Sequence, residues 1–177
     1  YAPERPRSFL YIVQDFIPGQ SLRDWRTANP DAPVETVMAF ALPAVKALRA
    51  LHRRETLHQD VKPDNFRVTP EGALVLVDFG SATVGSLSES RVLRPGAAEY
   101  AAPEYALGVK RDHRADQFSL AVMFYEQLTG RYPFGPGYKD AVTPADFRKL
   151  TYTSACTLNP HVPVWLDAAL AKALSLN

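Results

Sequence analysis

The sequence predicts a mainly α fold, a helical bundle around one buried central helix, with short β-hairpins that carry polar loops. Residues 116–128 are apolar on nearly every face, which is typical of a helix that runs through the middle of a domain. Apolar residues between 34 and 51 recur at helical spacing and indicate a second long helical segment. The β-like runs, such as residues 66–68, are only a few residues long. The 177 residues are 46% apolar and 22% charged, which is ordinary for one globular domain.

The N-terminal third of the chain predicts one strand and two helical segments. Residues 9–13 form an apolar run rich in aromatic and β-branched side chains, which predicts a buried strand. Ser21 is a predicted N-cap of a short helix. Pro43 lies inside the helical pattern of residues 34–51. We expect it to kink or split that helix, because a proline in a helix interior costs about 3 kcal/mol.

The rest of the chain alternates short elements with long loops. Residues 66–68 and 73–77 are predicted to be two strands joined by a turn. Residues 80–103 have no clear periodicity, and a loop of this length in a compact domain is usually functional. Beyond the central helix, the chain is rich in proline, with a short helix expected at 144–150 and a final amphipathic helix at 164–176.

Composition excludes several classes of function. The net charge of +1 gives no sign of a nucleic-acid partner. No apolar run approaches the roughly 18 residues that a membrane helix needs, so we expect no membrane insertion by this segment and a cytoplasmic location. Cys156 is the only cysteine, which excludes a disulfide within the chain and a zinc site built from several cysteines.

Four polar residues on two neighbouring loops suggest a chemistry. Asp60, Asn65 and Asp78 have short side chains with oxygen atoms, and Mg²⁺ binds a few such oxygens together with substrate phosphates. Lys62 is a point charge suited to a phosphate oxygen. Two carboxylates, an amide and a lysine in this arrangement suit metal-assisted phosphoryl transfer.

The order and spacing of three short segments resemble the signature of protein kinases. Residues 58–65 (HQDVKPDN), 78–80 (DFG) and 102–104 (APE) are similar to the family's H-R-D-L-x-x-x-N, D-F-G and A-P-E sequences. The resemblance covers residues 9 to 177 and implies the C-terminal lobe of a eukaryotic-type Ser/Thr protein kinase. It is greatest to bacterial kinases, in particular those fused behind a metal-dependent protein phosphatase domain.

The resemblance implies a role for each of the four polar residues. Asp60 and Lys62 are the implied catalytic residues: Asp60 orients the substrate hydroxyl proton, and Lys62 neutralises charge on the transferring phosphoryl group. Asn65 and Asp78 are the implied Mg²⁺ ligands. The implied cofactors are therefore ATP and Mg²⁺, with a protein as the substrate.

The resemblance also implies which residues contact the nucleotide. Residues 11–19 are similar to the strand and hinge behind and beside adenine, with the hinge strand at 9–15. This assigns Asp15 and Ile17 to the nucleotide site together with Lys62, Asn65 and Asp78. Arg67 stands where the family usually has an apolar residue under adenine, and a guanidinium can stack on a base plane.

Three further residues have implied structural roles. His58 is expected to brace the ring of Phe79, and Asp116 is expected to hold the catalytic loop of residues 58–65. Glu104 closes the activation segment of residues 78–104.

The resemblance covers only one lobe of a kinase. Residues 1–177 are predicted to form this C-terminal lobe. They lack the glycine-rich loop, the strand lysine and the helix glutamate that the N-lobe of a kinase contains. Because the chain opens on Tyr1 and not on Met, we expect it to be part of a larger protein that also supplies the N-lobe. The isolated lobe is expected to be inactive.

Two replacements near the catalytic loop depart from the family pattern. Gln59 stands in place of the arginine that normally binds a phosphate on the activation loop, and Ala97 stands in place of a threonine. We therefore expect that none of the hydroxyl residues of the loop is an obligatory activating phosphosite. These residues are Ser81, Thr83, Ser86, Ser88 and Ser90.

Three functions remain open. The first is an active Ser/Thr kinase, which the four polar residues favour. The second is a pseudokinase that acts as a regulatory or scaffold module, which Gln59, Ala97 and Arg67 favour. The third is a small-molecule phosphotransferase, a class that shares the loop pattern but lacks the A-P-E sequence and the lysine two residues after the loop aspartate.

Overall fold

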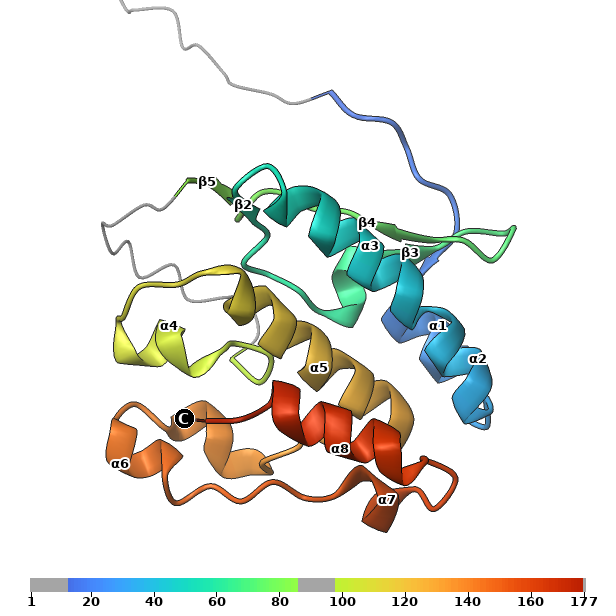
Figure 1. The fold of residues 1–177 in the computed structure, drawn as a ribbon. Helices are drawn as coiled ribbons and strands as arrows, with labels where there is room; N and C mark the ends of the chain where they lie inside the picture. Colours follow the sequence, from blue (N-terminus) through green and yellow to red (C-terminus); the bar gives the residue numbers. More distant parts are fainter. Residues whose placement is uncertain (1–12, 86–97, 177) are drawn as a thin grey trace, which may run out of the picture.

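The computed structural model describes residues 13–85 and 98–176 of the chain (Figure 1). Its helices are α1 (Leu22–Ala28), α2 (Val34–Ala39), α3 (Ala41–His52), α4 (Pro103–Leu107), α5 (His113–Thr129), α6 (Pro144–Phe147), α7 (Ala155–Leu158) and α8 (Val164–Ala173). Its strands are β1 (Gln20–Ser21), β2 (Thr56–Leu57), β3 (Phe66–Val68), β4 (Leu74–Leu76) and β5 (Thr83–Val84). Short 3-10 helices span Pro63–Asn65 and Pro136–Asp140.

Helix α5 is the central element of the fold. It contacts α2, α3, α7 and α8, and Figure 1 shows it between α3 on one side and α8 on the other. Twelve of its 17 residues are buried, and Gly130 ends it in a left-handed conformation at φ 69°. The prediction of a mainly α bundle around a buried central helix is therefore confirmed.

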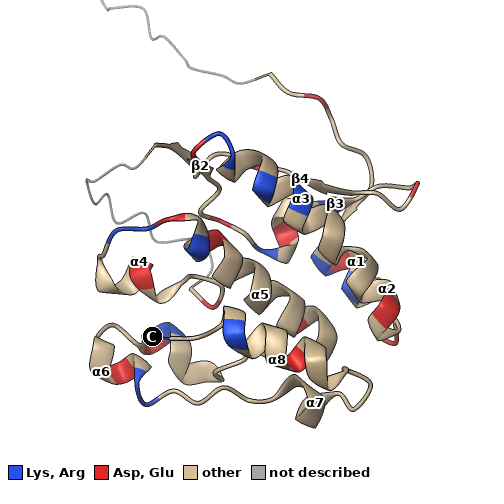
Figure 2. Ribbon diagram, in the orientation of Figure 1, with Lys and Arg blue, Asp and Glu red and all other residues tan. Residues whose placement is uncertain are grey.

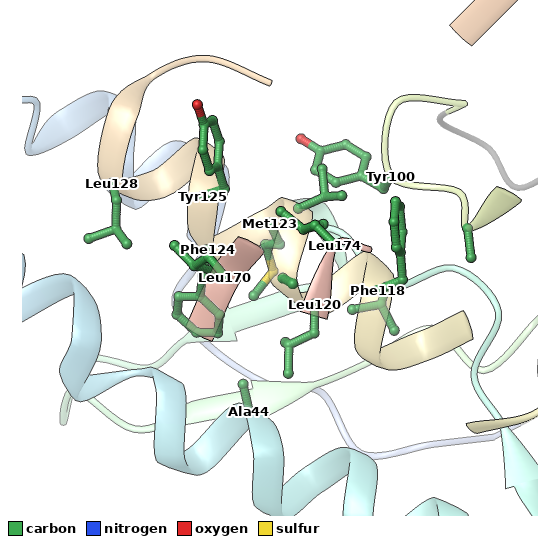
Figure 3. Close-up of a cluster of buried hydrophobic side chains, with 14 of the residues drawn as sticks. Ala44, Tyr100, Phe118, Leu120, Met123, Phe124, Tyr125, Leu128, Leu170 and Leu174 are labelled. Atoms are coloured by element: carbon green, nitrogen blue, oxygen red, sulfur yellow. The ribbon is translucent and has the colours of Figure 1, made fainter. Parts of the chain in front are cut away.

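The core forms around α5 because the eight consecutive residues from Phe118 to Tyr125 are all buried and, apart from Ser119, apolar. Figure 3 shows Ala44 of α3 together with Phe124 of α5, Leu170 of α8 and Leu174 just after α8 in one apolar cluster. Tyr125 is among the largest fully buried side chains, and its hydroxyl donates a hydrogen bond to the carbonyl oxygen of Thr153 at 2.7 Å. The buried ring thus packs in the core while its polar end remains paired.

The helix ends follow from local sequence. The Ser21 hydroxyl accepts the backbone N–H of Asp24 at 3.0 Å, which makes it the predicted N-cap of α1. The predicted split of residues 34–51 is also confirmed, since α2 ends at Ala39 and α3 begins at Ala41. Pro43 lies in the first turn of α3, where a missing N–H removes no helical hydrogen bond.

Two small antiparallel sheets flank the helices. In the first, β3 lies between β1 and β4, with Arg67 opposite Ser21 on one side and Val75 on the other. In the second, β2 pairs with β5, with Leu57 opposite Thr83. The β3–β4 hairpin was predicted from the sequence. Strands β1, β2 and β5 were not, because two-residue strands show no alternation.

Several predicted boundaries differ from the structure. The strand predicted at 9–15 lies mostly outside the described residues, and residues 13–15 belong to neither sheet, with Val13 85% exposed. No described strand lies beside these residues to pair with them. The helix predicted at 144–150 ends at Phe147, and the one predicted at 164–176 ends at Ala173. Within residues 13–85 and 98–176, no helix has the length and apolar character needed to cross a membrane.

Replacing Gly19 with Ala is expected to destabilise the turn that leads into β1. Gly19 has φ +107°, and an added Cβ would collide with the carbonyl oxygen of Val68. Gly72 is a matched control, because it also has a positive φ, +81°, but an added Cβ meets nothing within 4 Å. Gly72→Ala should cost about 1–2 kcal/mol in free energy of unfolding, and Gly19→Ala clearly more. Equal losses in urea unfolding would contradict the collision.

Candidate active site

The loop of residues 58–65 is held in place by the buried carboxylate of Asp116, in the first turn of α5. Asp116 accepts the backbone N–H of His58 through Oδ2 and that of Gln59 through Oδ1, both at 2.9 Å. Its Oδ2 also lies 2.8 Å from Nε2 of His52. The side chain is only 1% exposed, so these bonds replace all the water it would otherwise bind. The structure thus supports the predicted bracing role of Asp116.

Three of the predicted site residues form one cluster. The Lys62 ammonium lies 2.7 Å from Oδ2 of Asp60. The Asn65 amide donates to the backbone oxygen of Asp60 at 2.7 Å and to Oδ2 at 2.9 Å. The side chains of Asp60 and Lys62 are 12% and 18% exposed, so the pair is shielded but still reachable from solvent. One carboxylate oxygen of Asp60 is thus fixed by its neighbours, and no hydrogen bond from the described residues reaches Oδ1.

His58 connects this loop to the segment that contains Asp78. Its Nδ1 accepts the backbone N–H of Asp60 at 3.3 Å, so its proton resides on Nε2, which donates to the carbonyl oxygen of Val77 at 3.2 Å. The His58 ring is fully buried, and its centroid lies 5.4 Å from that of Phe79 in an edge-on contact. His58 therefore braces Phe79 as predicted.

Asp78 directly follows Val77, whose backbone is hydrogen-bonded to that of Asn65. The backbone N–H of Val77 donates to the carbonyl oxygen of Asn65 at 2.9 Å. Asp78 itself has φ 62°, a left-handed conformation that is uncommon for residues other than glycine and that often occurs at functional sites. Its carboxylate is exposed, and Oδ1 accepts the N–H of Gly80 at 3.2 Å.

The oxygen atoms of Asn65 and Asp78 fit a magnesium ion. Both amide hydrogens of Asn65 point to Asp60, which leaves Oδ1 as its open ligand atom. Oδ2 of Asp78 receives no hydrogen bond from the described residues. Those residues contain no group of three His, Cys, Asp or Glu side chains that would form a cage from protein alone. Two protein oxygens completed by substrate phosphates are the arrangement that Mg²⁺ commonly adopts.

The three remaining residues predicted to bind nucleotide make no hydrogen bond to this cluster within the described residues. Asp15 is exposed and Ile17 is half-buried, in a segment without regular structure. The Arg67 guanidinium, in the middle strand β3, donates a hydrogen bond to the carbonyl oxygen of Gly19. No hydrogen bond or ion pair of the described residues joins any of the three to Asp60. Their assignment to the nucleotide site stays a prediction.

A second network, which was not predicted from the sequence, connects the catalytic loop to α1 and α5. Arg23 donates to both carboxylate oxygens of Asp64 at 2.9 Å and to the Tyr100 hydroxyl at 3.0 Å. Glu126 accepts from Tyr100 and lies 3.4 Å from Arg23. The hydrogen bond from Arg23 lowers the pKa of Asp64, which favours the charged carboxylate. Burial raises the pKa of Tyr100, which keeps its hydroxyl protonated and able to donate.

Charged residues elsewhere follow no single-sign pattern. Figure 2 shows Lys and Arg interspersed with Asp and Glu over the described ribbon, with no continuous basic stripe. The ion pairs at the loop are Lys62 with Asp60 and Arg23 with Asp64. Arg114 with Asp112 and Lys149 with Asp146 form further pairs away from it.

Comparison with known proteins gives the family. A family model described as the protein kinase domain matches residues 3–172. A probable serine/threonine-protein kinase of Clostridium perfringens is 31% identical over 168 residues, covering 93% of this chain and 24% of the relative. Serine/threonine-protein kinase PknB of Mycolicibacterium smegmatis is 33% identical over 175 residues, covering 94% of this chain and 27% of the relative. The chain thus spans about a quarter of the length of these relatives. It belongs to the protein kinase family.

Proposed function

We propose that this segment transfers the γ-phosphate of ATP to Ser or Thr hydroxyl groups of protein substrates, as the catalytic-loop and substrate-binding half of a kinase domain. The observation that carries the proposal is the cluster of Asp60, Lys62 and Asn65 held against buried Asp116. The printed names of its bacterial relatives, which are serine/threonine-protein kinases, support the choice of acceptor. Lys62, two residues after Asp60, supports the same choice.

Asp60 is the proposed residue that orients the acceptor hydroxyl. Its Oδ2 is occupied by Lys62 and Asn65, so Oδ1 is the oxygen that remains to accept the hydroxyl proton. A positioned general base of this kind contributes about 10²–10⁴ to the rate. The Lys62 ammonium, 2.7 Å from Asp60, is placed to neutralise negative charge on the group being transferred.

Asn65 and Asp78 are the proposed holders of Mg²⁺. Mg²⁺ held there would supply positive charge that stabilises the phosphates of ATP during transfer. The backbone keeps the two proposed ligands near each other. The N–H of Val77, the residue before Asp78, donates a hydrogen bond to the carbonyl oxygen of Asn65. On the other side of Asp78, the half-exposed ring of Phe79 contacts buried His58. These contacts support the proposal that the backbone around the two ligands is positioned before nucleotide binds.

Other parts of the kinase domain are proposed to come from the same parent protein, the longer protein that contains this segment. They are the glycine-rich loop, the lysine and the glutamate of the N-lobe, which this chain would meet at its own hinge strand, proposed at residues 9–15. Asp15, Ile17 and Arg67 are proposed to contact the nucleotide at the boundary between the lobes. Because ATP is supplied in the cytoplasm, the proposed activity places this segment there. The fusion to a phosphatase domain stays a prediction.

A pseudokinase is the alternative that one observation favours. Arg67 lies in the strand expected under adenine, and its guanidinium is bonded to the carbonyl oxygen of Gly19. If this bond persists when nucleotide is present, a charged group occupies the floor of the adenine site. Such a protein would keep the fold and bind a partner without transferring phosphate.

The experiment that tests the proposal is transfer of γ-phosphate from Mg²⁺-ATP by the parent protein to itself and to a generic Ser/Thr protein substrate. Wild type should transfer, and Asp78→Ala should lose at least about 10²-fold in rate, because a ligand of the metal is missing. Asp31→Ala is the matched control, since Asp31 is also an exposed loop aspartate but lies outside the site. Folded wild-type protein that transfers nothing would favour the pseudokinase.

A further inference from the structure

The side chain of Gln59, in the catalytic loop, makes no hydrogen bond to the cluster of Asp60, Lys62 and Asn65 within the described residues. Asp60, Lys62 and Asn65 bond to one another, whereas the Gln59 amide Nε2 donates to the hydroxyl of Thr83 in β5. Gln59 is only 8% exposed and has φ 66°, a left-handed conformation that a side chain other than glycine adopts at a cost. A buried polar side chain in a strained conformation needs a compensating contact, and the bond to Thr83 is that contact.

This bond closes the sheet that the chain forms after Asp78. Strands β2 and β5 pair over two residues each, with Leu57 opposite Thr83, and the Gly85 N–H donates to the carbonyl oxygen of Glu55 at 2.8 Å. A ladder this short is marginal by itself. Gln59 lies two residues after the end of β2, and Thr83 is the first residue of β5. The Gln59–Thr83 hydrogen bond therefore extends the pairing of the two strands by one side-chain contact.

The contact also has a rigid support. The Gln59 backbone N–H donates to buried Asp116 at 2.9 Å, and Asp116 holds the neighbouring His58 N–H as well. A continuous series of hydrogen bonds therefore connects Asp116 of α5 through Gln59 to Thr83, which lies five residues after Asp78. The chain that leaves Asp78 is fixed on one side by His58 and Phe79 and on the other by this path.

We propose that Gln59 and Thr83 form a neutral latch that positions the metal-binding Asp78 segment without any phosphate. Both are positioning residues, acting through Asp78 and not on the substrate. An uncharged amide–hydroxyl pair needs no phosphorylation to form, which gives a structural reason for the sequence-based expectation that Thr83 is not an activating phosphosite. The kinetic part of this inference rests on the proposed function, whereas the structural part does not.

The kinetic test compares two variants of Thr83 in the parent protein. Thr83→Val keeps the shape but removes the hydroxyl, and should lower kcat about tenfold with the KM for ATP unchanged. Thr83→Ser keeps the hydroxyl and should restore kcat to within about twofold of wild type. Gln59→Leu should match Thr83→Val, and the double variant should lose no more than either alone, since both remove the same bond. Additive losses, or an unchanged kcat in Thr83→Val, would overturn the positioning role.

A second measurement decides the latch even if the protein transfers no phosphate. Hydrogen exchange of the Gly85 amide should accelerate in Thr83→Val and Gln59→Leu but not in Thr83→Ser. The amides of the β3–β4 hairpin serve as the internal control and should be unchanged. Unaltered exchange at Gly85 would overturn the latch.

A third measurement applies to an active wild type. Complete removal of phosphate from the protein, verified by mass spectrometry, should leave kcat unchanged. A tenfold loss of kcat would overturn the proposal that the latch works without phosphate.

Discussion

Replacing Asp60 with Asn in the parent protein is expected to lower kcat for phosphoryl transfer by about 10²–10⁴-fold. Asn keeps the size of the side chain and an oxygen for Lys62 and the Asn65 amide, which lie 2.7 and 2.9 Å from Oδ2 of Asp60. It cannot accept the hydroxyl proton that the proposal assigns to Oδ1. Affinity for ATP should change little, because the contribution of Asp60 is to the reaction step.

Steady-state kinetics with a Ser/Thr protein substrate measure this effect, together with nucleotide binding on the same samples. Asp140→Asn is the control, because Asp140 is an exposed aspartate in the 3-10 helix of Pro136–Asp140, outside the site, and should leave kcat unchanged. If Asp60→Asn kept a kcat within about threefold of wild type, Asp60 would not be the general base.

Replacing Asp116 with Ala is expected to cause the largest loss of stability of any substitution in the site. The carboxylate is 1% exposed and accepts two backbone N–H groups, from His58 and Gln59, besides lying 2.8 Å from His52. Alanine leaves these donors buried without partners, at about 1–3 kcal/mol each. We therefore expect the free energy of unfolding to fall by about 3–5 kcal/mol.

Asp112→Ala in the same helix is the control for this substitution. Asp112 is the N-cap of α5, and its side chain accepts the backbone N–H of Arg114 at 2.8 Å at a more exposed position. Loss of such a cap costs about 1 kcal/mol. Urea unfolding of the parent protein, followed by hydrogen exchange of the α5 amides, should separate the two variants. Equal losses would mean that Asp116 does not support the loop as the structure indicates.

The parts of the fold that the sequence predicted are those set by local pattern. Helix α5 was predictable because its residues are apolar on every face and a glycine follows it. The break between α2 and α3 was predictable because Pro43 interrupts the helical pattern. Asp60, Lys62 and Asn65 lie within six residues of one another, so their clustering also follows from local chain geometry.

The parts that the sequence missed depend on contacts between distant residues. Arg23 meets Tyr100 and Glu126 across 77 and 103 positions, and His52 meets Asp116 across 64. No spacing rule predicts such contacts before the helices are packed. Strands β2 and β5 have two residues each and exist only because the chain returns beside itself after Asp78.

The measurement that tests the account most directly is the simultaneous determination of ATP binding and γ-phosphate transfer by the parent protein in the presence of Mg²⁺. We predict that wild type binds Mg²⁺-ATP and produces phosphoserine or phosphothreonine in a protein substrate, and that Asp60→Asn binds Mg²⁺-ATP but does not transfer phosphate. Wild-type protein that is folded and binds Mg²⁺-ATP, yet forms no phosphoamino acid, would contradict the account and identify the domain as a pseudokinase.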